Sequence, residues 1–517
     1  MAWLSILPMR RAVAPLLLLI FVLAFWWWTG RLQELPPAPP VGSPCLSYAP
    51  FERGQSPFDE NLVIQPEQIE RQVRALAKIA PCLRSYSVGQ GLDRLPEAAQ
   101  RAGVQIYLGI WLGRDTTANE FEVTRALELA KEYPQTIRAL VVGNEVLLRK
   151  EMTFAQLAAI LDRVRAASAL PITYADVWEN WAENPKLAEH VDFATIHILP
   201  YWEDEPIGIE GAIAHVVEVR RAVGAELAPL DVLIGETGWP AQGRQREGAV
   251  PSPVNQARYL SEILTVLAAE GWHANLIEAI DQDWKRLLEG TVGGHWGLLD
   301  NTLDTKFAWG GNLSDHPHWI WQAGLGLLLG FAVLALCGGW RGFALALVSA
   351  LAVPWWLEQA PIISLDLADW LRNGLAALLG VALPLLGALA MQRDLARPTL
   401  ASLAGRAPRP RGWLGWSLAL GLASSLVLTI PWTLGLVFDP RYRDFTTAAV
   451  APGLAALALL RRGTGPQQAE RAIAGVLGLS AAIILLNEKP TNGHSVLCCL
   501  TLALFAASLW PRRAGRA

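Results

Sequence analysis

Eight short apolar runs between residues 46 and 280 most constrain the fold of this chain. They lie at 46–51, 83–88, 104–110, 137–144, 172–177, 193–198, 232–235 and 276–280. Stretches of helical periodicity separate them, such as 65–80 and 154–167, and Thr153 is a suitable N-cap for the second. Alternating strands and helices over roughly 270 residues favour an α/β fold of the size of a (β/α)8 barrel. We therefore predict a TIM barrel over residues 45–315.

An N-terminal apolar segment precedes the predicted barrel. Of the 517 residues, 52% are hydrophobic, which is high for a purely soluble protein. Arg10 and Arg11 precede an apolar stretch at 12–28 that is long enough to cross a bilayer. A cleaved signal peptide is the alternative, but tryptophans at 26–28 replace the small residues of a cleavage site. We predict a signal anchor over residues 1–30, followed by a Pro-rich linker at 31–44.

A second apolar region follows the predicted barrel and continues nearly to the last residue. We count seven candidate spans, at 319–339, 342–357, 371–391, 413–437, 445–460, 472–486 and 495–510. Several are near the lower length limit for crossing a bilayer. Residues 316–517 are therefore predicted to form an all-α membrane domain with about seven transmembrane helices.

The charges of the short loops predict the orientation of these spans. With a cytoplasmic N-terminus, the inside segments hold most of the arginines: Arg10, Arg11, Arg341, Arg393, Arg397, Arg406, Arg409, Arg411, Arg461, Arg462, Arg471, Arg512, Arg513 and Arg516. The outside short loops hold only Arg441, Arg443 and Lys489, with Arg372 at a span edge. The positive-inside rule then favours both termini in the cytoplasm and the barrel in the periplasm or outside the cell. We predict a multi-pass membrane protein with both termini on the cytoplasmic side.

Two glutamates stand at the ends of predicted buried strands. Glu145 closes the run 139–145, and Glu236 follows the run 232–235, so they fall on the fourth and seventh strands. Both are expected on the C-terminal rim, where barrel active sites lie. Cleavage of a glycosidic bond needs one carboxyl that protonates the leaving oxygen and one that stays ionised. For either glutamate alone, a strand-end ion pair is the structural alternative.

The sequence around both glutamates resembles a known family. Gly143-Asn144-Glu145-Val146 and Glu236-Thr237-Gly238-Trp239-Pro240 are similar to the two signature motifs of glycoside hydrolase family 17, the β-1,3-glucanase family. The segments 280–285 and 295–299 also resemble the strand-eight and closing segments of that family. The resemblance covers about residues 45–310. With spans on both sides, the chain looks like the bacterial membrane-bound branch, which includes glucan transglycosylases and proteins named β-1,6-glucan synthases.

The resemblance implies roles for individual residues. Glu145 matches the general acid/base and Glu236 the nucleophile of a retaining mechanism, and Asn144 is expected to bind the sugar 2-hydroxyl. Further candidates for sugar contact are Tyr86, Tyr201, Trp202, Trp239, Asp281, Gln282, Trp284 and Lys285. Each of these has a structural alternative, as part of a polar network or of the core. Leu199 departs from the family pattern, since plant-type members have a tyrosine there, and Tyr201 or His197 could substitute for it.

The five cysteines divide into two groups. Cys337, Cys498 and Cys499 fall in predicted spans, where we expect small buried thiols. Cys45 and Cys82 each precede one of the first two strands. Neighbouring parallel strands run about 4.8 Å apart, and a disulfide needs Cα atoms roughly 4.4 to 6.8 Å apart. We predict a Cys45–Cys82 disulfide, with two separate thiols as the alternative.

The sequence gives no sign of a cofactor. The eight histidines show no metal-ligand spacing, no glycine loop is placed to bind phosphate, and the net charge of −4 argues against nucleic acid. Hydrolysis or transfer by two carboxylates needs no metal or cofactor. The expected partners are a β-glucan, membrane lipid and, as a candidate, a glucan synthase. The oligomeric state is not indicated.

Three classes of function compete. The first is a retaining β-1,3-glucan transglycosylase that passes the glucosyl-enzyme to a glucan acceptor, by elongation or by branching through linkages such as β-1,6. The second is an endo- or exo-acting β-1,3-glucanase that passes it to water. The third is a non-catalytic glucan sensor, which the presence of both carboxylates disfavours. A transporter is also disfavoured, because central charges are nearly absent from the spans.

Overall fold

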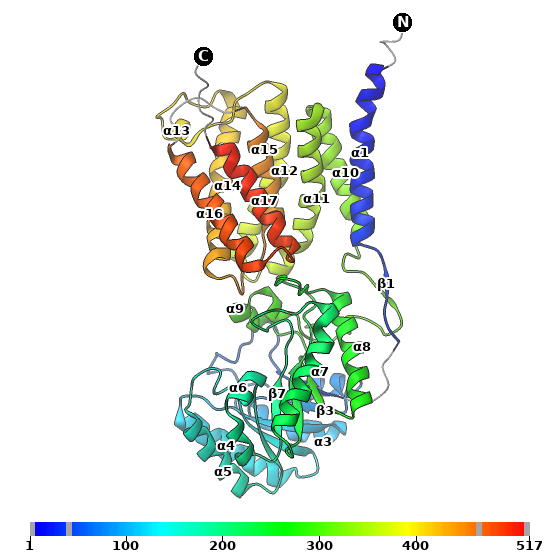
Figure 1. The fold of residues 1–517 in the computed structure, drawn as a ribbon, viewed down its shortest axis with the longest axis vertical. Helices are drawn as coiled ribbons and strands as arrows, with labels where there is room; N and C mark the ends of the chain where they lie inside the picture. Colours follow the sequence, from blue (N-terminus) through cyan, green and yellow to red (C-terminus); the bar gives the residue numbers. More distant parts are fainter. Residues whose placement is uncertain (1–5, 38–43, 462–467, 511–517) are drawn as a thin grey trace. The chain divides into compact units, whose positions relative to one another are not determined.

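The computed structural model describes residues 6–37, 44–461 and 468–510, with side chains from Val13 onward. Contacts divide the chain into two compact units (Figure 1). The barrel unit comprises Gln33–Gly243 and Gly248–Leu313, and the helical unit comprises Met1–Leu32, Arg244–Glu247 and Ser314–Ala517. Arg462, Arg512, Arg513 and Arg516, which support the predicted orientation, lie outside the described residues, as do the side chains of Arg10 and Arg11.

The barrel unit is a closed barrel of eight parallel strands, in the order β2 to β9. The strands are β2 (Cys45–Ser47), β3 (Cys82–Arg84), β4 (Gln105–Ile110), β5 (Ile137–Asn144), β6 (Ile172–Val177), β7 (Ala194–His197), β8 (Val232–Thr237) and β9 (Ala274–Leu276). The first and last strands pair through Cys45 with Asn275 and Leu46 with Leu276, which closes the ring. The predicted (β/α)8 class, followed by a helical region, is confirmed.

The predicted strand at 276–280 is wrong in its boundaries. The strand β9 ends at Leu276, and Ile280 forms only an isolated bridge with Leu299. The intervening residues bond to loops instead: the Glu278 N–H donates to the Trp296 carbonyl, and the Ala279 N–H donates to the Ser47 carbonyl. The run is apolar because loops bury it, and hydrophobicity alone does not distinguish this burial from a strand ladder.

Helices cover the outside of the barrel. They are α2 (Pro66–Leu76), α3 (Leu95–Ala102), α4 (Thr116–Glu132), α5 (Phe154–Ala167), α6 (Trp178–Glu183), α7 (Ile209–Glu226), α8 (Pro253–Glu270) and the short α9 (Arg286–Glu289). The predicted cap is present, because Thr153 and Gln156 form a capping box at the start of α5. The predicted helix at 65–80 is shorter than expected and ends at Leu76.

The strands bury two separate apolar clusters. Alternate residues such as Ile106 and Leu108 pack outward against the helices in the main core. The opposite face contributes a smaller cluster that includes Tyr107, Val141 and Leu233, and also Cys45 and Cys82. Side chains alternate across a strand, so this second cluster lies inside the barrel. Cys45 and Cys82 form a disulfide with a Cα–Cα distance of 4.4 Å.

A two-stranded sheet joins the two ends of the barrel unit. Its strands are β1 (Gln33–Glu34) and β10 (Asn312–Leu313), which pair in antiparallel fashion. Part of the predicted Pro-rich linker is therefore a strand, while residues 38–43 lie outside the described part of the chain.

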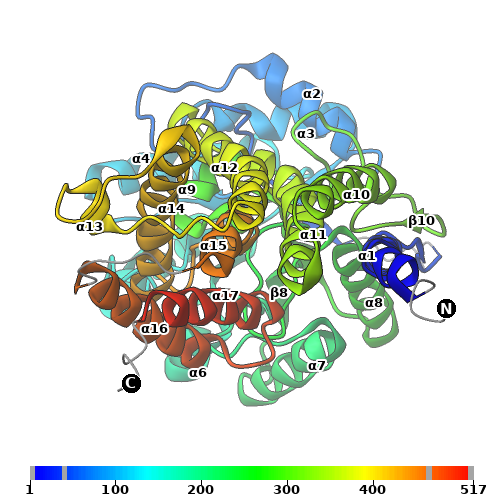
Figure 2. The ribbon, with the colours of Figure 1, turned by 90° about the horizontal axis from the view of Figure 1, so that it is seen from above.

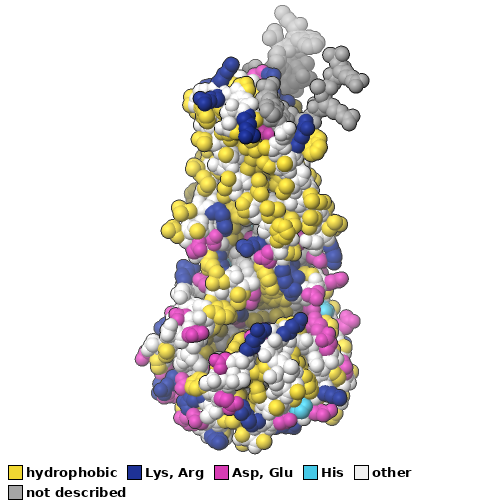
Figure 3. Space-filling model, turned by 90° about the vertical axis from the view of Figure 1, so that its left-hand side faces the viewer, with side chains coloured by type: hydrophobic (Ala, Val, Ile, Leu, Met, Phe, Trp, Pro, Cys, Tyr) yellow, Lys and Arg dark blue, Asp and Glu magenta, His cyan; other side chains and the backbone are white. Residues whose placement is uncertain are grey.

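The helical unit contains a helix at each of the eight predicted spans. These are α1 (Ile6–Thr29), α10 (Trp319–Leu336), α11 (Gly339–Ile363), α12 (Leu367–Gln392), α14 (Gly412–Phe438), α15 (Thr447–Leu459), α16 (Gln468–Glu488) and α17 (Gly493–Leu509), with the short α13 (Leu400–Leu403) between α12 and α14. Among the described residues, five helices are long and apolar enough to cross a membrane: α10, α11, α12, α14 and α16. The described part of α1, with α15 and α17, is shorter. Together the helices suggest a membrane protein, and hydrophobic side chains crowd the surface of this unit in Figure 3.

The first helix belongs to this unit and packs against α10 and α11, beside which it lies in Figure 2. Leu18, Val22 and Trp26 are fully buried in this contact. Gly330 on α10 allows the approach, because a Cβ there would lie 2.8 Å from Leu18 Cδ2. Small residues serve this purpose where membrane helices pack closely.

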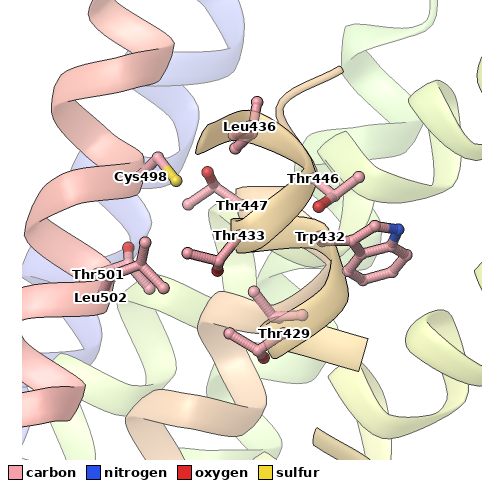
Figure 4. A pocket seen from close by; sticks show the side chains of 10 residues that line it. Thr429, Trp432, Thr433, Leu436, Thr446, Thr447, Cys498, Thr501 and Leu502 are labelled. Carbon is pink, nitrogen blue, oxygen red and sulfur yellow. The ribbon is translucent and has the colours of Figure 1, made fainter. Parts of the chain in front are cut away.

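A small cavity in the helical unit has a mainly apolar wall that includes several threonines (Figure 4). Its lining comes from α14, α15 and α17 and consists of Thr429, Trp432, Thr433, Leu436, Thr446, Thr447, Val450, Cys498, Thr501 and Leu502. It holds about 10 Å³, room for one water-sized sphere. Of the predicted span cysteines, Cys498 and Cys499 are buried and Cys337 is half-buried.

Candidate active site

The structure brings Glu145 and Glu236 together at the C-terminal ends of the barrel strands. Glu145 directly follows β5, and Glu236 is the last residue but one of β8. An oxygen of each carboxylate and a ring nitrogen of His197 all lie within 4.8 Å of one another. The two carboxylates are therefore close enough to act on one bond.

The backbone at Glu145 is unusual. Its φ of 53° lies in the left-handed region that residues other than glycine rarely adopt, and Gly143 two residues earlier has a φ of 88°. The pairing of β5 with β6 shifts register between Val141 and Asn144, and the Glu145 N–H then donates to the Ala175 carbonyl at 2.8 Å. Such strained positions concentrate at functional sites.

Glu236 is buried and held as a carboxylate. Its Oε1 accepts hydrogen bonds from Arg84 Nη1 at 2.6 Å and from the Tyr86 hydroxyl at 2.7 Å. Burial pushes the pKa of Glu236 up, but the charges of His197, Arg84 and Lys285 and the Tyr86 hydrogen bond outweigh it. They hold this pKa at about 2, so Glu236 is ionised at neutral pH.

Arg84 is a site residue that the sequence reasoning missed. It lies on β3, is buried, and donates from one guanidinium nitrogen to Glu236 and from the other to Asn144 Oδ1. Its guanidinium carbon also lies 3.9 Å from the centre of the Tyr86 ring. An arginine inside a short apolar strand was the available signal, since a buried guanidinium needs a buried anion.

Glu145 has a different environment from Glu236. Its side chain is 25% exposed, whereas that of Glu236 is 7% exposed. Its Oε1 pairs with His197 Nδ1 at 2.9 Å, and no arginine or lysine pairs with it among the described residues. Two carboxylates in such different surroundings suit two different roles in one reaction.

Lys285 lies near the site, but a second carboxylate holds it. Its Nζ donates to Glu278 Oε2 at 2.7 Å, and both side chains are nearly buried. Burial raises the pKa of Glu278 to about 7 despite the opposing charge of Lys285. The contribution of Lys285 to the site is its charge, which lowers the pKa of Glu236.

The remaining predicted contacts divide by exposure. Tyr86, Trp202 and Trp284 are partly exposed, whereas Asn144 is buried and its Oδ1 accepts a hydrogen bond from Arg84. Trp202 stacks on Trp296 at 6.4 Å with an interplanar angle of 20°. The roles of the three partly exposed side chains in sugar binding stay predictions.

Four other predicted contacts are buried, so we no longer expect them to touch a sugar directly. Tyr201 and Trp239 are fully buried in the core, where Trp239 Nε1 donates to the Val250 carbonyl. Asp281 accepts from Lys306 Nζ at 2.6 Å, and Gln282 donates to the Ala49 carbonyl. Both polar residues support the loops that follow β9.

One group of described residues has enough ligand-type atoms to consider a metal ion: Glu145, His197 and Glu236. The Arg84 guanidinium already pairs with Glu236, and His197 Nδ1 already pairs with Glu145. A cation beside the buried guanidinium would be repelled. The donor set therefore suits proton transfer and nucleophilic attack.

A closed (β/α)8 barrel with two close carboxylates at its C-terminal rim is an arrangement that glycoside hydrolases use. Residues 45–297 match a family model described as the BtgE/BtgC glycoside hydrolase domain. Similar proteins include a "Glucan 1,3-beta-glucosidase" of Saccharomyces cerevisiae, 24% identical over 46% of this chain and 83% of the relative, and one of Candida albicans, 27% identical over 44% and 80%. A "Probable family 17 glucosidase" of Saccharomyces cerevisiae is 23% identical over 43% of this chain and 58% of its own length. The solved family 17 β-1,3-glucanosyltransferase of Rhizomucor miehei is 23% identical with a TM-score of 0.45, over 50% of this chain and 94% of that one. By the family model and the yeast relatives, the barrel part of this chain is therefore similar to glycoside hydrolases, proteins of family 17 among them.

Proposed function

We propose that this protein is a retaining β-1,3-glucan transglycosylase. The observation that carries the proposal is the approach of Glu145 and Glu236 to within 4.8 Å, one oxygen from each. Retaining glycosidases hold their two carboxyls about 5 Å apart, whereas inverting enzymes leave room for a water between them. The choice of β-1,3-glucan rests on the names of the similar yeast proteins.

The first step of the reaction uses both carboxylates at once. Glu236 attacks the anomeric carbon of the donor glucan through one oxygen, and the glycosidic C–O bond breaks. Glu145 gives its proton to the departing oxygen, so a shortened glucan leaves and a glucosyl ester remains on Glu236. The buried, ionised state of Glu236 and the more open position of Glu145 suit these roles.

The second step returns the enzyme to its starting state. Glu145 takes the proton of an acceptor hydroxyl, the acceptor oxygen attacks the anomeric carbon, and the ester bond to Glu236 breaks. A glucan acceptor gives a longer or branched glucan, through a β-1,3 or β-1,6 bond. Partly exposed tryptophans at the rim, Trp111, Trp178, Trp202 and Trp284, offer flat surfaces on which an acceptor glucose can stack in competition with water.

A β-1,3-glucan hydrolase is the second candidate, because the similar yeast proteins are named glucosidases. It shares the first step and passes the ester to water. For either activity, transglycosylase or hydrolase, we propose that the protein lies in the cytoplasmic membrane of a bacterium, with the barrel on the outer side and both termini inside. The asymmetry of the loop arginines supports this orientation. A glucan synthase that supplies the donor chain is the proposed partner.

Product analysis tests the proposal. The purified full-length protein is incubated with linear β-1,3-gluco-oligosaccharides of one length, and the products are resolved by size and linkage. Longer or branched products of retained configuration are expected. Shorter products alone would establish the hydrolase instead, inverted products would refute the retaining mechanism, and binding without turnover would indicate a glucan sensor.

A further inference from the structure

His197 is the one histidine among the described residues that contacts both predicted catalytic carboxylates. It is the last residue of β7, and its register partner on β8 is Glu236. Its Nδ1 lies 2.9 Å from Glu145 Oε1 and 3.8 Å from Glu236 Oε2. The stronger contact is therefore with Glu145, although the sequence suggested His197 as a substitute for a residue that orients the nucleophile.

We propose that His197 positions the general acid/base: its Nδ1–H donates to Glu145 Oε1, which leaves Glu145 Oε2 to carry the proton for the leaving group. The inference rests on the proposed function and assigns a role within it that neither motif around the glutamates contains. His197 is a positioning residue in this scheme, because it acts on the sugar only through Glu145.

The surroundings of the ring fix which nitrogen carries the hydrogen. Nδ1 faces oxygens of two carboxylates, which accept hydrogen bonds and do not donate them when ionised. A hydrogen on Nδ1 satisfies this contact in both the neutral and the charged ring. Nε2 is buried and has no hydrogen-bond partner among the described residues, so nothing there competes for the tautomer.

The contact also fixes which oxygen of Glu145 does the chemistry. If Glu145 Oε1 carried the acid proton on the side that faces Nδ1–H, two hydrogens would point at each other. The proton of the acid form then lies on Oε2. Since the Glu145 side chain is 25% exposed while the His197 ring is fully buried, the ring holds the inner side of the carboxyl and the outer side stays open.

The barrel makes room for this ring. A Cβ on Gly235 would lie 2.8 Å from His197 Cδ2 and 2.4 Å from Thr195 Cγ2, so the residue before Glu236 must be glycine for the ring to occupy its place. The charged groups that face the ring are Glu145 from the end of β5, Glu236 from β8 and Arg84 from β3. The two carboxylates favour the protonated ring, and Arg84 and burial oppose it.

Three full-length variants test the proposal. His197→Phe removes the donor and keeps a planar ring, and His197→Gln keeps an N–H donor. His190→Phe is the matched control, because His190 pairs with Asp162 at 2.8 Å before the start of β7, at the other end of the barrel. For each variant, kcat and KM are measured across pH on a β-1,3-gluco-oligosaccharide and on a β-glucosyl fluoride, whose leaving group needs no proton. Thermal unfolding shows whether the variant is folded.

For His197→Phe we expect a loss of roughly 10- to 100-fold in kcat on the oligosaccharide, the size expected for one hydrogen bond to a charged group, with KM little changed. The loss on the fluoride should be several-fold smaller. His197→Gln should restore much of the rate, and His190→Phe should match the parent protein.

Equal losses on both substrates would overturn the role of His197 while leaving the proposed function intact, since the parent protein would still cleave glucan. Inactivity of the folded parent protein on β-1,3-glucan would overturn the proposed function, and the role of His197 with it. If His197→Phe does not fold, His197→Gln decides alone: a loss that is larger on the oligosaccharide than on the fluoride supports the proposal, and a loss that is equal on both substrates refutes it.

Discussion

The barrel unit and the helical unit bury polar groups in different ways. Inside the barrel, buried charges occur in matched sets, such as Arg84 with Glu236 and Lys285 with Glu278. In the helical unit the polar residues buried within helices are mainly neutral, and include Ser349, Asn373, Ser425, Thr429, Thr433 and Ser480. Its buried charged residues, such as Glu470 and Glu488, lie at helix ends. An ion at the centre of a span is costly, so the neutral buried groups of the helical unit suit a membrane anchor, whereas the charged groups of the candidate site belong to the barrel unit.

Among the variants, the removal of Glu236 should have the largest effect on kcat/KM, because Glu236 is one of the matched buried charges of the barrel. Glu236→Ala is expected to lower kcat/KM on β-1,3-glucan by on the order of 10⁴-fold or more, because no nucleophile remains. With a glycosyl fluoride of inverted configuration and a sugar acceptor, the variant should still form glycosidic bonds, since the fluoride occupies the vacated space. Glu210→Ala, on the surface of α7, is the control. Near-normal activity of Glu236→Ala on glucan would contradict the role of Glu236 as nucleophile and, with it, the functional assignment based on glycoside hydrolase family 17.

Glu145→Ala should be the next largest. We expect a loss of roughly 10² to 10⁴ in rate on glucan, the usual contribution of a general acid/base. On aryl glucosides whose leaving groups need no protonation, the first step should be nearly unaffected, and added azide should accelerate the second. These rates are measured by pre-steady-state release of the aryl group. Equal losses on all leaving groups would contradict the acid role.

Arg84 tests whether the matched charges control the nucleophile. In Arg84→Met the pKa of Glu236 should rise from about 2 toward its ordinary value of 4.5, because the Arg84 charge and its hydrogen bond are lost. The charges of His197 and Lys285 remain, and the His197 ring nitrogen lies 3.8 Å from the carboxylate, compared with 2.6 Å for Arg84. Glu236 must be ionised to attack, so the acidic limb of the kcat/KM profile should move to higher pH. Loss of a buried ion-pair partner should also cost about 3 to 5 kcal/mol of stability. Arg84→Lys, which keeps the charge, should move the acidic limb less. An unmoved acidic limb in Arg84→Met would show that Arg84 does not set the pKa of Glu236.

The disulfide tests the amino-terminal side of the barrel, away from the carboxylates. Replacing Cys45 and Cys82 with serine should lower the free energy of unfolding by about 2 to 4 kcal/mol, since the bridge spans 37 residues, with kcat/KM unchanged below the melting transition. The free Cys337→Ser variant is the control. Thermal melts with and without reductant measure the effect, and recovery of both cysteines as free thiols by non-reducing peptide mapping would refute the bond.

The smallest effect is expected in the helical unit. Thr429→Val removes a buried hydroxyl from the wall of the cavity in Figure 4 and keeps its shape. Stability should change by about 1 kcal/mol or less, and kcat/KM should not change. A tenfold fall in kcat/KM in this folded variant would show that the helical unit takes part in the chemistry and is more than an anchor.

The alternation of apolar runs with stretches of helical periodicity predicted most of the barrel. Strands such as 137–144 and 172–177 were placed at their observed positions, because runs of buried residues bounded by polar turns have few other structures open to them. The last strand was misplaced, since loops bury 277–280 as fully as a sheet would. Glu145 and Glu236 could be found because each follows a buried run directly. Arg84 could not be found, and the contact of His197 with Glu145 could not, because their partners lie on strands that are distant in the sequence.

The sequence by itself determined which residues reach the C-terminal rim and which segments are apolar enough for a membrane, because both follow from local order along the chain. Only the tertiary structure decided that Arg84 pairs with Glu236, that His197 pairs with Glu145, and that Trp239 and Tyr201 lie in the core. Those facts depend on how strands β3, β5, β7 and β8 face one another across a closed barrel. A pairwise distance inside such a ring is set by strand order and register, which no single segment of the sequence contains.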